Sequence, residues 1–580
     1  MCGIFAVSGK KDNASKIVLK GLKMLEYRGY DSWGIGVKKN NQKIEIKKDI
    51  GKISQINNLP ILGNEAMGHS RWATHGGVTK QNAHPHKVGK VTIVHNGIFE
   101  NYLEIKKQYP HHKYQSQTDT EVIAVCINDF LKKGKKPLQA ISQATEKIKG
   151  RFAILVMIEG EKGIYGARKG SPLIIGRGIE ETFIASDIPA FLQETNIVNY
   201  LDDNEMVYIN GKKATFFKLN TEKIKKRNIK VKCSNDETCK GHYSHFMIKE
   251  IFDQKETISK AINHSNKQLN NFIKILQASN GSYFVACGTA NKMAMAGEYF
   301  FAEIAGRKIN VVPASEMKYF EKFINKKTVI MAISQSGETA DVLESLENGK
   351  KKGAKIIAMT NVKNSSIARI ADEHLSINAG IEKAVASTKA ATSQMALCLL
   401  LSYVDIGKIN TGKQILNITA GSINDMLNPR YENFIKRIAK NIFKNRNLFI
   451  IGRGSLYPMA LEAAIKIQEV SYINAQGFAA GELKHGPIAL IEKNTPCIVL
   501  GDDTETISNA TELAARGAKI IGIAPKKDQI FDQWIKVPDC QTAQPIATII
   551  PVQILAYHLA LLRRLNPDMP RNLAKSVTVK

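Results

Sequence analysis

Residues 328–339 read Thr-Val-Ile-Met-Ala-Ile-Ser-Gln-Ser-Gly-Glu-Thr, a short apolar run that ends in a loop rich in hydroxyl side chains. The apolar run predicts a buried strand, and the residues after the loop predict a helix that ends at Gly353. Residues 282–304 have the same order, with a strand over 282–286, the turn Cys287-Gly288-Thr289 and then a helix. Strands that alternate with helices indicate a parallel sheet with helices on its faces.

This pattern occurs a second time, 164 residues further along the chain. Gly288 corresponds to Gly452, which follows the apolar run 448–451, and the hexapeptide KGAKII at 352–357 corresponds to RGAKII at 516–521. Two elements that align at one offset predict a duplicated α/β domain in the C-terminal two thirds of the chain. The expected boundaries are 243–410 for the first copy, 411–560 for the second and 561–580 for a C-terminal tail.

The loop of the first copy is a candidate phosphate site. It offers the side chains of Ser334, Gln335, Ser336 and Thr339. They lie at a predicted helix N-terminus, where backbone N–H groups and the helix dipole favour an anion. The alternative is that these hydroxyls only cap the helix. The corresponding loop 501–506 of the second copy, Gly-Asp-Asp-Thr-Glu-Thr, carries two carboxylates that would repel phosphate, so we expect phosphate to bind only the first copy.

One predicted helix of the second copy, 460–471, carries charges among apolar residues. Glu462, Lys466 and Glu469 are spaced i, i+4 and i+7, so they share one helix face. A solvated salt-bridge face is the usual explanation of such a pattern. Here the flanking residues are largely apolar, which predicts a buried helix whose charges are costly and therefore functional. A carboxylate beside an ammonium stays ionised and can act as a base.

The first 220 residues differ, because short β-branched runs alternate with turns. Strands are expected at 4–7, 91–94, 153–157, 173–175 and 206–209, and helices at 17–26 and 119–132. Strands separated in sequence from helices indicate an α+β domain with stacked sheets over 1–220. The polar, lysine-rich stretch 221–242 is interpreted as a linker.

Composition limits the classes of function. The formal charge is +29, but lysine outnumbers arginine 66 to 16 and the basic residues are spread along the chain, which favours a solvated surface over a nucleic-acid site. Eight cysteines without a Cys-x-x-Cys pair argue against a zinc ribbon or a disulfide framework. The N-terminus lacks the pattern of a signal peptide, and the apolar run 546–562 is short for a membrane span. We therefore expect a soluble cytoplasmic protein without a nucleic-acid or membrane partner.

Several N-terminal motifs carry candidate chemistry. Cys2 becomes the first residue if Met1 is removed, and its α-amine could then accept the thiol proton; an inert buried cysteine is the alternative. The turn 71–76, Arg-Trp-Ala-Thr-His-Gly, could hold an amino-acid carboxylate. Asn96 beside Gly97 suits an oxyanion hole. Asp119 could hold an ammonium group, or it could cap the helix that follows.

These motifs, together with Tyr-Arg-Gly-Tyr-Asp-Ser at 27–32, resemble the class II, N-terminal-nucleophile glutamine amidotransferases. The resemblance implies that Cys2 attacks the carboxamide of glutamine, forms a thioester and releases ammonia. It also implies an oxyanion hole of Asn96 and the Gly97 N–H, and Trp72 as a gate to the ammonia path, a plain core aromatic being the alternative. The residues implied to bind the ends of glutamine are Arg71, Thr74, His75 and Asp119.

The duplicated half resembles a pair of sugar isomerase (SIS) domains, and the whole chain resembles the family of isomerising glutamine–fructose-6-phosphate aminotransferases. The tail 570–579, Pro-Arg-Asn-Leu-Ala-Lys-Ser-Val-Thr-Val, is the most specific piece. The resemblance implies the substrates glutamine and fructose 6-phosphate, with glucosamine 6-phosphate made for amino-sugar (UDP-N-acetylglucosamine) synthesis. It further implies a homodimer with neither a metal nor an organic cofactor.

The resemblance also implies roles in the sugar site. Glu469 would shuttle the proton, and His485, in the partner subunit's site, would assist ring opening. Lys575 would form a Schiff base with the open-chain ketose. Thr289, Lys466, Val385 and Ser387 would line the substrate. Two departures from the family pattern are Ala290, where a serine is expected, and Trp33, where an alanine is expected.

Two other functions stay open from the sequence. The first is another class II amidotransferase, which the phosphosugar-type duplication and the tail with Lys575 argue against. The second is a non-catalytic sugar-phosphate sensor, which would need the loop 334–339 but not the combination of Cys2, Glu469, His485 and Lys575. Because Ala290 lacks the hydroxyl of the serine expected at this position, phosphate binding would be several-fold weaker, since one hydrogen bond contributes about 0.5–1.5 kcal/mol.

Overall fold

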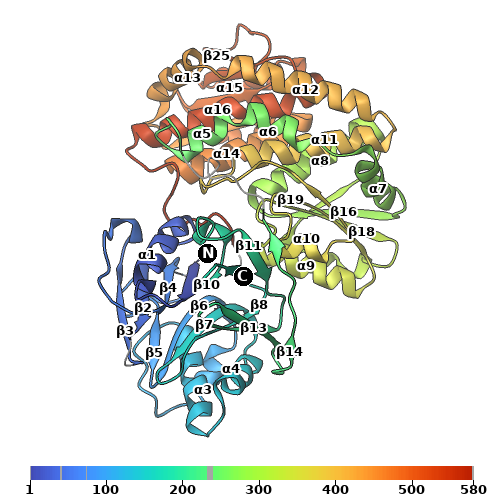
Figure 1. The fold of residues 1–580 in the computed structure, drawn as a ribbon. Coiled ribbons are helices and arrows are strands. Elements are labelled where there is room, and N and C mark those ends of the chain that lie inside the picture. Colours follow the sequence, from blue (N-terminus) through green and yellow to red (C-terminus); the bar gives the residue numbers. More distant parts are fainter. Residues whose placement is uncertain (1, 40–41, 74, 232–239, 578–580) are drawn as a thin grey trace. The chain divides into compact units, whose positions relative to one another are not determined.

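The computed structural model describes residues 2–39, 42–73, 75–231 and 240–577. The chain divides into two compact units (Figure 1). The first unit contains the chain up to residue 238 together with the residues from Ala574 onward, and the second contains residues 239–573.

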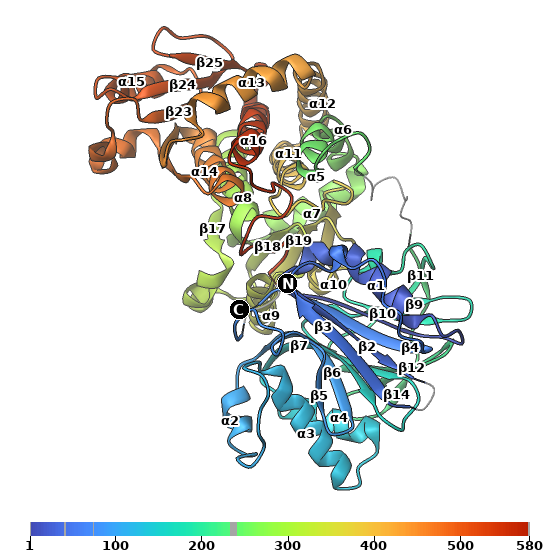
Figure 2. The same cartoon turned by 90° about the vertical axis from the view of Figure 1, so that its left-hand side faces the viewer.

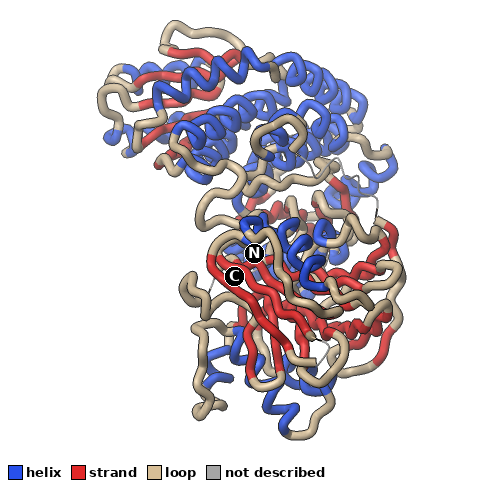
Figure 3. The backbone as a smooth tube through the Cα atoms, turned by 60° about the vertical axis from the view of Figure 1, so that its left-hand side comes forward, coloured by secondary structure: helices blue, strands red, loops and turns tan. Residues whose placement is uncertain are grey.

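The N-terminal unit has two stacked β-sheets between helices (Figure 3). The first sheet has the strand order β15-β11-β9-β10-β1-β4-β2-β3, with bounds β1 Gly3–Ser8, β2 Ser32–Lys38, β3 Ile44–Ile50, β4 Glu65–Arg71, β9 Ile174–Arg177, β10 Thr182–Ala185, β11 Ile197–Tyr200 and β15 Ile229–Lys230. The second has the order β14-β13-β12-β8-β7-β6-β5, with bounds β5 His86–Val88, β6 Val91–Phe99, β7 Gly150–Ile158, β8 Ile164–Lys169, β12 Glu205–Asn210, β13 Lys213–Lys218 and β14 Lys223–Ile224. The helices are α1 Ala14–Met24, α2 Tyr102–Lys106, α3 Thr120–Lys132 and α4 Pro137–Glu146.

The alternation of side chains along the strands explains this layering. In β1, Phe5 and Val7 pack toward α1, whereas Ile4 and Ala6 pack between the two sheets. Successive side chains of a strand point to opposite faces, so a strand that is apolar at every position must be covered on both sides. The helix α1 covers the first sheet, and α3 and α4 cover the second (Figure 2). The expected α+β domain with stacked sheets is confirmed.

The first residues of the expected linker form two short strands in the structure. The stretch interpreted as a linker contains β14, which pairs with β13, and β15, which pairs with β11. These are edge strands of two residues each. Their polar side chains give no apolar alternation, because an edge strand can be held by backbone hydrogen bonds alone. Residues 232–239 of the expected linker lie outside the described residues.

The C-terminal unit contains two five-stranded parallel sheets with the same topology. The first has the order β17-β16-β18-β19-β20, with bounds β16 Gly281–Ala286, β17 Asn310–Pro313, β18 Thr328–Ser334, β19 Lys355–Thr360 and β20 Glu373–Ser376. The second has the order β22-β21-β23-β24-β25, with bounds β21 Asn447–Gly452, β22 Asn474–Ala479, β23 Pro496–Leu500, β24 Lys519–Ala524 and β25 Gln533–Lys536. This equivalence confirms the duplication predicted from the 164-residue offset.

Helices between the two sheets join both copies in one continuous core (Figure 1). The helices of the unit are α5 Phe246–Phe252, α6 Gln254–Ala261, α7 Asn266–Gln277, α8 Gly288–Ala305, α9 Ala340–Lys351, α10 Ser366–Ile370, α11 Lys389–Asp405, α12 Ile409–Met426, α13 Pro429–Ile442, α14 Tyr457–Ser471, α15 Thr504–Ala514 and α16 Gln544–Leu562. The shared core brings α8 of the first copy against α14 of the second.

The apolar run near the C-terminus forms the long helix α16. By length and composition, residues 541–562 could cross a membrane, but 89% of their most apolar window is buried inside the structure. The helix packs against α13 and α14. A helix that is apolar on all sides is typical of the interior of a large core, so the prediction of a buried helix is confirmed.

Candidate active sites

Cys2 lies directly before β1, where three neighbouring segments contact it. The Trp72 N–H donates to Cys2 Sγ at 3.2 Å, and the thiol lies 3.4 Å from the Trp72 carbonyl oxygen. The Cys2 carbonyl accepts hydrogen bonds from Asn96 Nδ2 at 2.9 Å and from Arg28 Nε at 3.3 Å. The segments predicted to form one site, around residues 2, 28, 71–75 and 95–97, therefore meet at this cysteine.

The environment of Cys2 keeps its thiol protonated. Burial raises the pKa of the Cys2 thiol above its ordinary value, and the nearby Arg71 guanidinium opposes this only in part. A thiol attacks as its thiolate, so a base must take the proton during the reaction. An α-amine with an ordinary pKa of about 7.7–8.0 is suited to that task.

Asn96 and Gly97 occupy the end of β6 beside Cys2. One Nδ2 hydrogen of Asn96 goes to the Cys2 carbonyl, which leaves the second hydrogen of the amide for another acceptor. Gly97 has φ +133°, and a Cβ there would lie 2.0 Å from the Arg151 carbonyl oxygen. Only glycine fits this position, which explains the Asn-Gly pair.

The turn after β4 is shaped by Arg71. Its guanidinium donates to the carbonyl oxygens of His75, Gly76 (3.0 Å) and Gly77 (3.1 Å). Three of its five N–H donors thus hold the turn. The ring of His75 packs edge-on against Tyr102, with centroids 5.7 Å apart. Thr74, also predicted to bind glutamine, lies outside the described residues.

Asp119 does not cap α3 with its side chain. Its Oδ2 instead accepts the backbone N–H of Phe99 at 2.9 Å, which ties the start of α3 to the end of β6. The carboxylate is buried, with 5% of the residue exposed. Of the two interpretations left open by the sequence, the cap is excluded, and the ammonium site remains a prediction.

Four buried histidines, His69, His84, His86 and His95, lie beneath this site, and the sequence reasoning gave none of them a role. The rings of His69 and His84 are 4.1 Å apart, and those of His84 and His86 are 4.7 Å apart. Burial lowers the pKa of His69 to about 3 and that of His95 to about 4, so both are neutral near pH 7. His69 Nε2 donates to the His95 carbonyl at 3.0 Å and thereby braces the strand that carries Asn96. In the described part of the chain, no group of three or more His, Cys, Asp or Glu could hold a metal ion.

In the C-terminal unit, the predicted phosphate loop lies between β18 and α9. Ser334 Oγ accepts the Gly337 N–H at 3.0 Å, and Ser336 Oγ accepts the Glu338 N–H at 3.2 Å. Thr339 is the N-cap residue of α9, but its side chain makes no capping hydrogen bond. The capping alternative therefore does not account for Thr339, and Gln335 lies half-exposed on the same turn.

The loop depends on a glycine and has no equivalent in the second copy. Gly337 has φ +67°, and a Cβ there would lie 2.0 Å from Ser365 Oγ. In the second copy, Asp503 Oδ1 caps α15 by accepting the Thr506 N–H at 2.9 Å. A carboxylate of the chain itself occupies the place where an anion would bind.

The charged face of α14 is buried, as the sequence predicts. Lys466 Nζ lies 2.6 Å from Glu469 Oε2 and 3.4 Å from Glu462 Oε1. The side chains of Lys466 and Glu462 are fully buried, whereas that of Glu469 is 26% exposed. Thr289 Oγ1, from α8 of the first copy, donates to Glu462 Oε1 at 3.1 Å. Glu469 is therefore the member of this group that a ligand could reach.

Burial changes the ionisation of this group. It raises the pKa of Glu462 to about 7, although the Lys466 ammonium acts in the opposite direction. Burial would lower the pKa of Lys466, but its two carboxylate partners outweigh that effect and raise it. Lys466 is therefore a permanent cation that orients Glu469.

The remaining candidate residues lie at separate places in the fold. Val385 and Ser387 lie in the loop between β20 and α11, and His485 is exposed at the end of a short 3-10 helix, Ala480–His485. Lys575 is half-buried in the C-terminal segment that groups with the N-terminal unit. Ala290 packs against the shared core, and Trp33, in β2, is buried in the core that the first sheet of the N-terminal unit shares with α1.

Both halves of the chain match known protein families. The glutamine amidotransferase domain family matches residues 57–230, and the SIS domain family matches residues 275–403 and 441–563. The glutamine–fructose-6-phosphate aminotransferase [isomerizing] of Clostridium tetani is 40% identical, and that of Thermococcus kodakarensis is 38% identical, each over 100% of both chains. The chain belongs to the isomerizing glutamine–fructose-6-phosphate aminotransferase family.

A solved structure agrees with this assignment. The C-terminal domain of glucosamine-fructose-6-phosphate aminotransferase from Francisella tularensis is 31% identical, with a TM-score of 0.53, and covers 57% of this chain and 99% of its own. Tagatose-6-phosphate ketose/aldose isomerase from Escherichia coli, at 16% identity and a TM-score of 0.50, shares the fold alone. The family that the sequence motifs indicated is therefore confirmed. The roles of the individual site residues remain predictions.

The raised pKa of Glu462 gives a stability prediction for this aminotransferase. The native state keeps the Glu462 proton up to about pH 7, whereas the unfolded chain loses it near pH 4.3, so stability falls as pH rises between these values. Glu462→Gln removes this effect. The stability of the variant relative to wild type should increase by about 3 kcal/mol from pH 4.5 to pH 8, measured as melting temperature across that range. A difference that does not change with pH would contradict the assignment.

Proposed function

We propose that this chain hydrolyses glutamine in its N-terminal unit and uses the ammonia to convert fructose 6-phosphate into glucosamine 6-phosphate in its C-terminal unit. The relatives that match it end to end are named for this reaction. One observation carries the proposal: a single chain holds both the Cys2 site and the buried Glu462–Lys466–Glu469 group.

In the N-terminal unit, Cys2 attacks the carboxamide carbon of glutamine. Its α-amine, exposed once Met1 is removed, accepts the thiol proton and returns it to the leaving ammonia. The second Asn96 Nδ2 hydrogen and the Gly97 N–H stabilise the oxyanion. Arg71, Thr74, His75 and Asp119 bind the charged ends of glutamine, an assignment that the resemblance to the class II amidotransferases supports.

In the C-terminal unit, the substrate phosphate binds the hydroxyls and backbone N–H groups of the loop 334–339. Glu469 removes a proton from C1 of the aminated open-chain sugar and delivers it to C2, which moves the carbonyl from C2 to C1. The Lys466 ammonium holds the Glu469 carboxylate in place at 2.6 Å. His485 assists ring opening and Lys575 activates the ketose as a Schiff base.

Supplying glutamine and fructose 6-phosphate to the purified protein tests the proposal. We expect glutamate and glucosamine 6-phosphate in equal amounts. Glutamate without amino sugar would indicate a different class II amidotransferase or a bare glutaminase. Binding of fructose 6-phosphate without turnover would indicate a sugar-phosphate sensor.

Lys575→Arg tests the Schiff-base role. Arginine keeps the positive charge but cannot act as the amine nucleophile, because it stays protonated in proteins. Amino-sugar formation should fall by at least about 10²-fold while basal glutamine hydrolysis remains. Retained synthesis would remove Lys575 from the mechanism.

The enzyme is further proposed to work as a cytoplasmic homodimer without a nucleic-acid or membrane partner. The exposure of His485 supports a role for this residue outside its own subunit's site. The buried state of α16 supports the absence of a membrane anchor. Mass measurement of the native assembly and of the processed N-terminus would test the dimer and the removal of Met1.

A further inference from the structure

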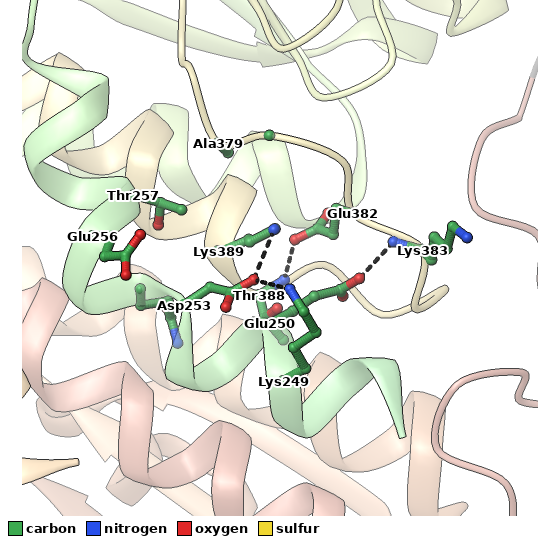
Figure 4. A network of polar contacts seen from close by, with 12 residues as sticks. Lys249, Glu250, Asp253, Glu256, Thr257, Ala379, Glu382, Lys383, Thr388 and Lys389 are labelled. Carbon is green, nitrogen blue, oxygen red and sulfur yellow. Dashed lines mark hydrogen bonds and ion pairs between the residues drawn. The ribbon is translucent and has the colours of Figure 1, made fainter. Parts of the chain in front are cut away.

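The loop between β20 and α11, residues 377–388, carries Val385 and Ser387 and is held by three acidic residues. These residues are Glu250 on α5, Glu382 in the loop itself and Asp568 near the C-terminus (Figure 4 shows the first two). All of them belong to the C-terminal unit.

Glu250 and Asp568 fix the backbone of this loop. Glu250 is buried, and its Oε1 accepts the N–H group of Lys383 at 2.5 Å (Figure 4). The same oxygen accepts the N–H group of Ala384 at 3.3 Å. The Asp568 carbonyl accepts the Val385 N–H at 3.0 Å. The Asp568 carboxylate binds the first N–H groups of α5, at 2.8 and 2.9 Å. The backbone that leads to Ser387 is therefore fixed from outside the loop.

Glu382 acts on the other side of Ser387. Its Oε1 accepts the N–H groups of Thr388 at 2.9 Å and of Ala390 at 3.0 Å, at the N-terminus of α11. The helix dipole favours an anion at this place. Its Oε2 accepts the Ser387 hydroxyl at 3.1 Å. The residue is 4% exposed, so this carboxylate is compensated by hydrogen bonds rather than by water.

The contact with Glu382 sets the direction of the Ser387 hydroxyl. A carboxylate only accepts hydrogen bonds, so the single hydroxyl proton of Ser387 points to Glu382. What Ser387 can offer a ligand is then its oxygen lone pairs. We propose that Glu382 is a positioning residue that makes Ser387 an obligatory hydrogen-bond acceptor for a hydroxyl group of the sugar phosphate, an inference that rests on the proposed function.

Glu382→Gln tests this with little change of shape. The glutamine oxygen can keep both backbone N–H groups of α11, which places its NH₂ group toward Ser387. The opposite orientation would set the NH₂ against two N–H donors. With the NH₂ as its neighbour, the Ser387 hydroxyl must accept, and its proton turns toward the ligand. We expect KM for fructose 6-phosphate to rise about five-fold, with kcat and the melting temperature nearly unchanged.

Ser387→Ala provides the second half of a double-mutant cycle. It should raise KM by a similar factor, and adding Glu382→Gln should then change nothing further, because Glu382 acts through the hydroxyl. Glu256→Gln is the matched control: this exposed carboxylate on α6 pairs with Lys260 and should leave KM unchanged.

The outcomes of these experiments distinguish a failure of the proposed function from a failure of the positioning role of Glu382. If the wild type makes no glucosamine 6-phosphate, the proposed function fails. If it does, an unchanged KM in Glu382→Gln, or an equal further rise in the Ser387→Ala background, overturns the positioning role. Should Glu382→Gln fail to fold, Ser387→Ala alone decides, since an unchanged KM in that variant overturns the proposal.

Discussion

Cys2→Ala is expected to abolish glutamine-dependent synthesis and to spare synthesis from free ammonia. The substitution removes the proposed nucleophile, whose sulfur accepts the Trp72 N–H at 3.2 Å, while the contacts to the Cys2 carbonyl involve only backbone atoms of residue 2. Loss of a nucleophile lowers kcat by at least about 10³-fold. Glutamate release, and glucosamine 6-phosphate formed with glutamine or with an ammonium salt, are the quantities to measure.

Cys126→Ala is the matched control for this variant. Cys126 is a buried cysteine of α3 in the same unit, and burial raises the pKa of its thiol. Glutamine hydrolysis should stay within about twofold of wild type, as for an inert cysteine. Equal loss of glutamine-dependent and ammonia-dependent synthesis in Cys2→Ala would contradict the two-site mechanism, since no isomerising step uses this thiol.

The sequence predicted much of the fold because local patterns carry it. In β1 and β7 nearly every residue is apolar, and such runs require cover on both faces. The offset between Gly288 and Gly452 predicted two equivalent sheets, since repeated segments fold alike. The spacing of the charged residues on α14 also predicted that they share one face of the helix, and this face is buried in the structure.

Contacts between distant segments could not be predicted from such patterns. The hydrogen bond from Thr289 to Glu462 joins two copies of the duplication, and nothing local to either residue indicates it. Asp119 precedes a helix and is a residue type that often caps helices, yet its carboxylate accepts the backbone N–H of Phe99 on β6. Tertiary packing decides between such alternatives, because each is compatible with the local sequence.

Several residues that shape the sites were missed for a related reason. His69 and His84 lie in runs without a periodic signal, and only the edge-on contact of their rings shows that they form a cluster. Glu250 and Glu382 are isolated acids in the sequence, which usually lie on the surface. The segment His-Pro-His at 84–86 is the sequence feature that could have indicated this histidine cluster, because closely spaced histidines often belong to one site.

Glu469→Gln is expected to abolish amino-sugar formation with either nitrogen source. Glutamine has the same shape and can still accept a hydrogen bond from Lys466, which lies 2.6 Å away, so the helix should keep its packing. It cannot accept a proton from carbon, and loss of a general base lowers the rate by about 10²–10⁴-fold. Product formation should be measured with glutamine and with an ammonium salt, and glutamate release without sugar.

The two nitrogen sources make this result specific to the isomerising step. Added ammonium would repair a defect in ammonia supply, as expected for Cys2→Ala, but it would not repair the loss of Glu469, the proposed base on α14. Glu505→Gln, an exposed carboxylate on α15 of the same unit, should leave both activities unchanged. Synthesis by Glu469→Gln at more than about a tenth of the wild-type rate would exclude Glu469 as the base. The proton transfer would then have to be assigned to another group, and Glu462, with its pKa of about 7, is the nearest ionisable candidate on the same face.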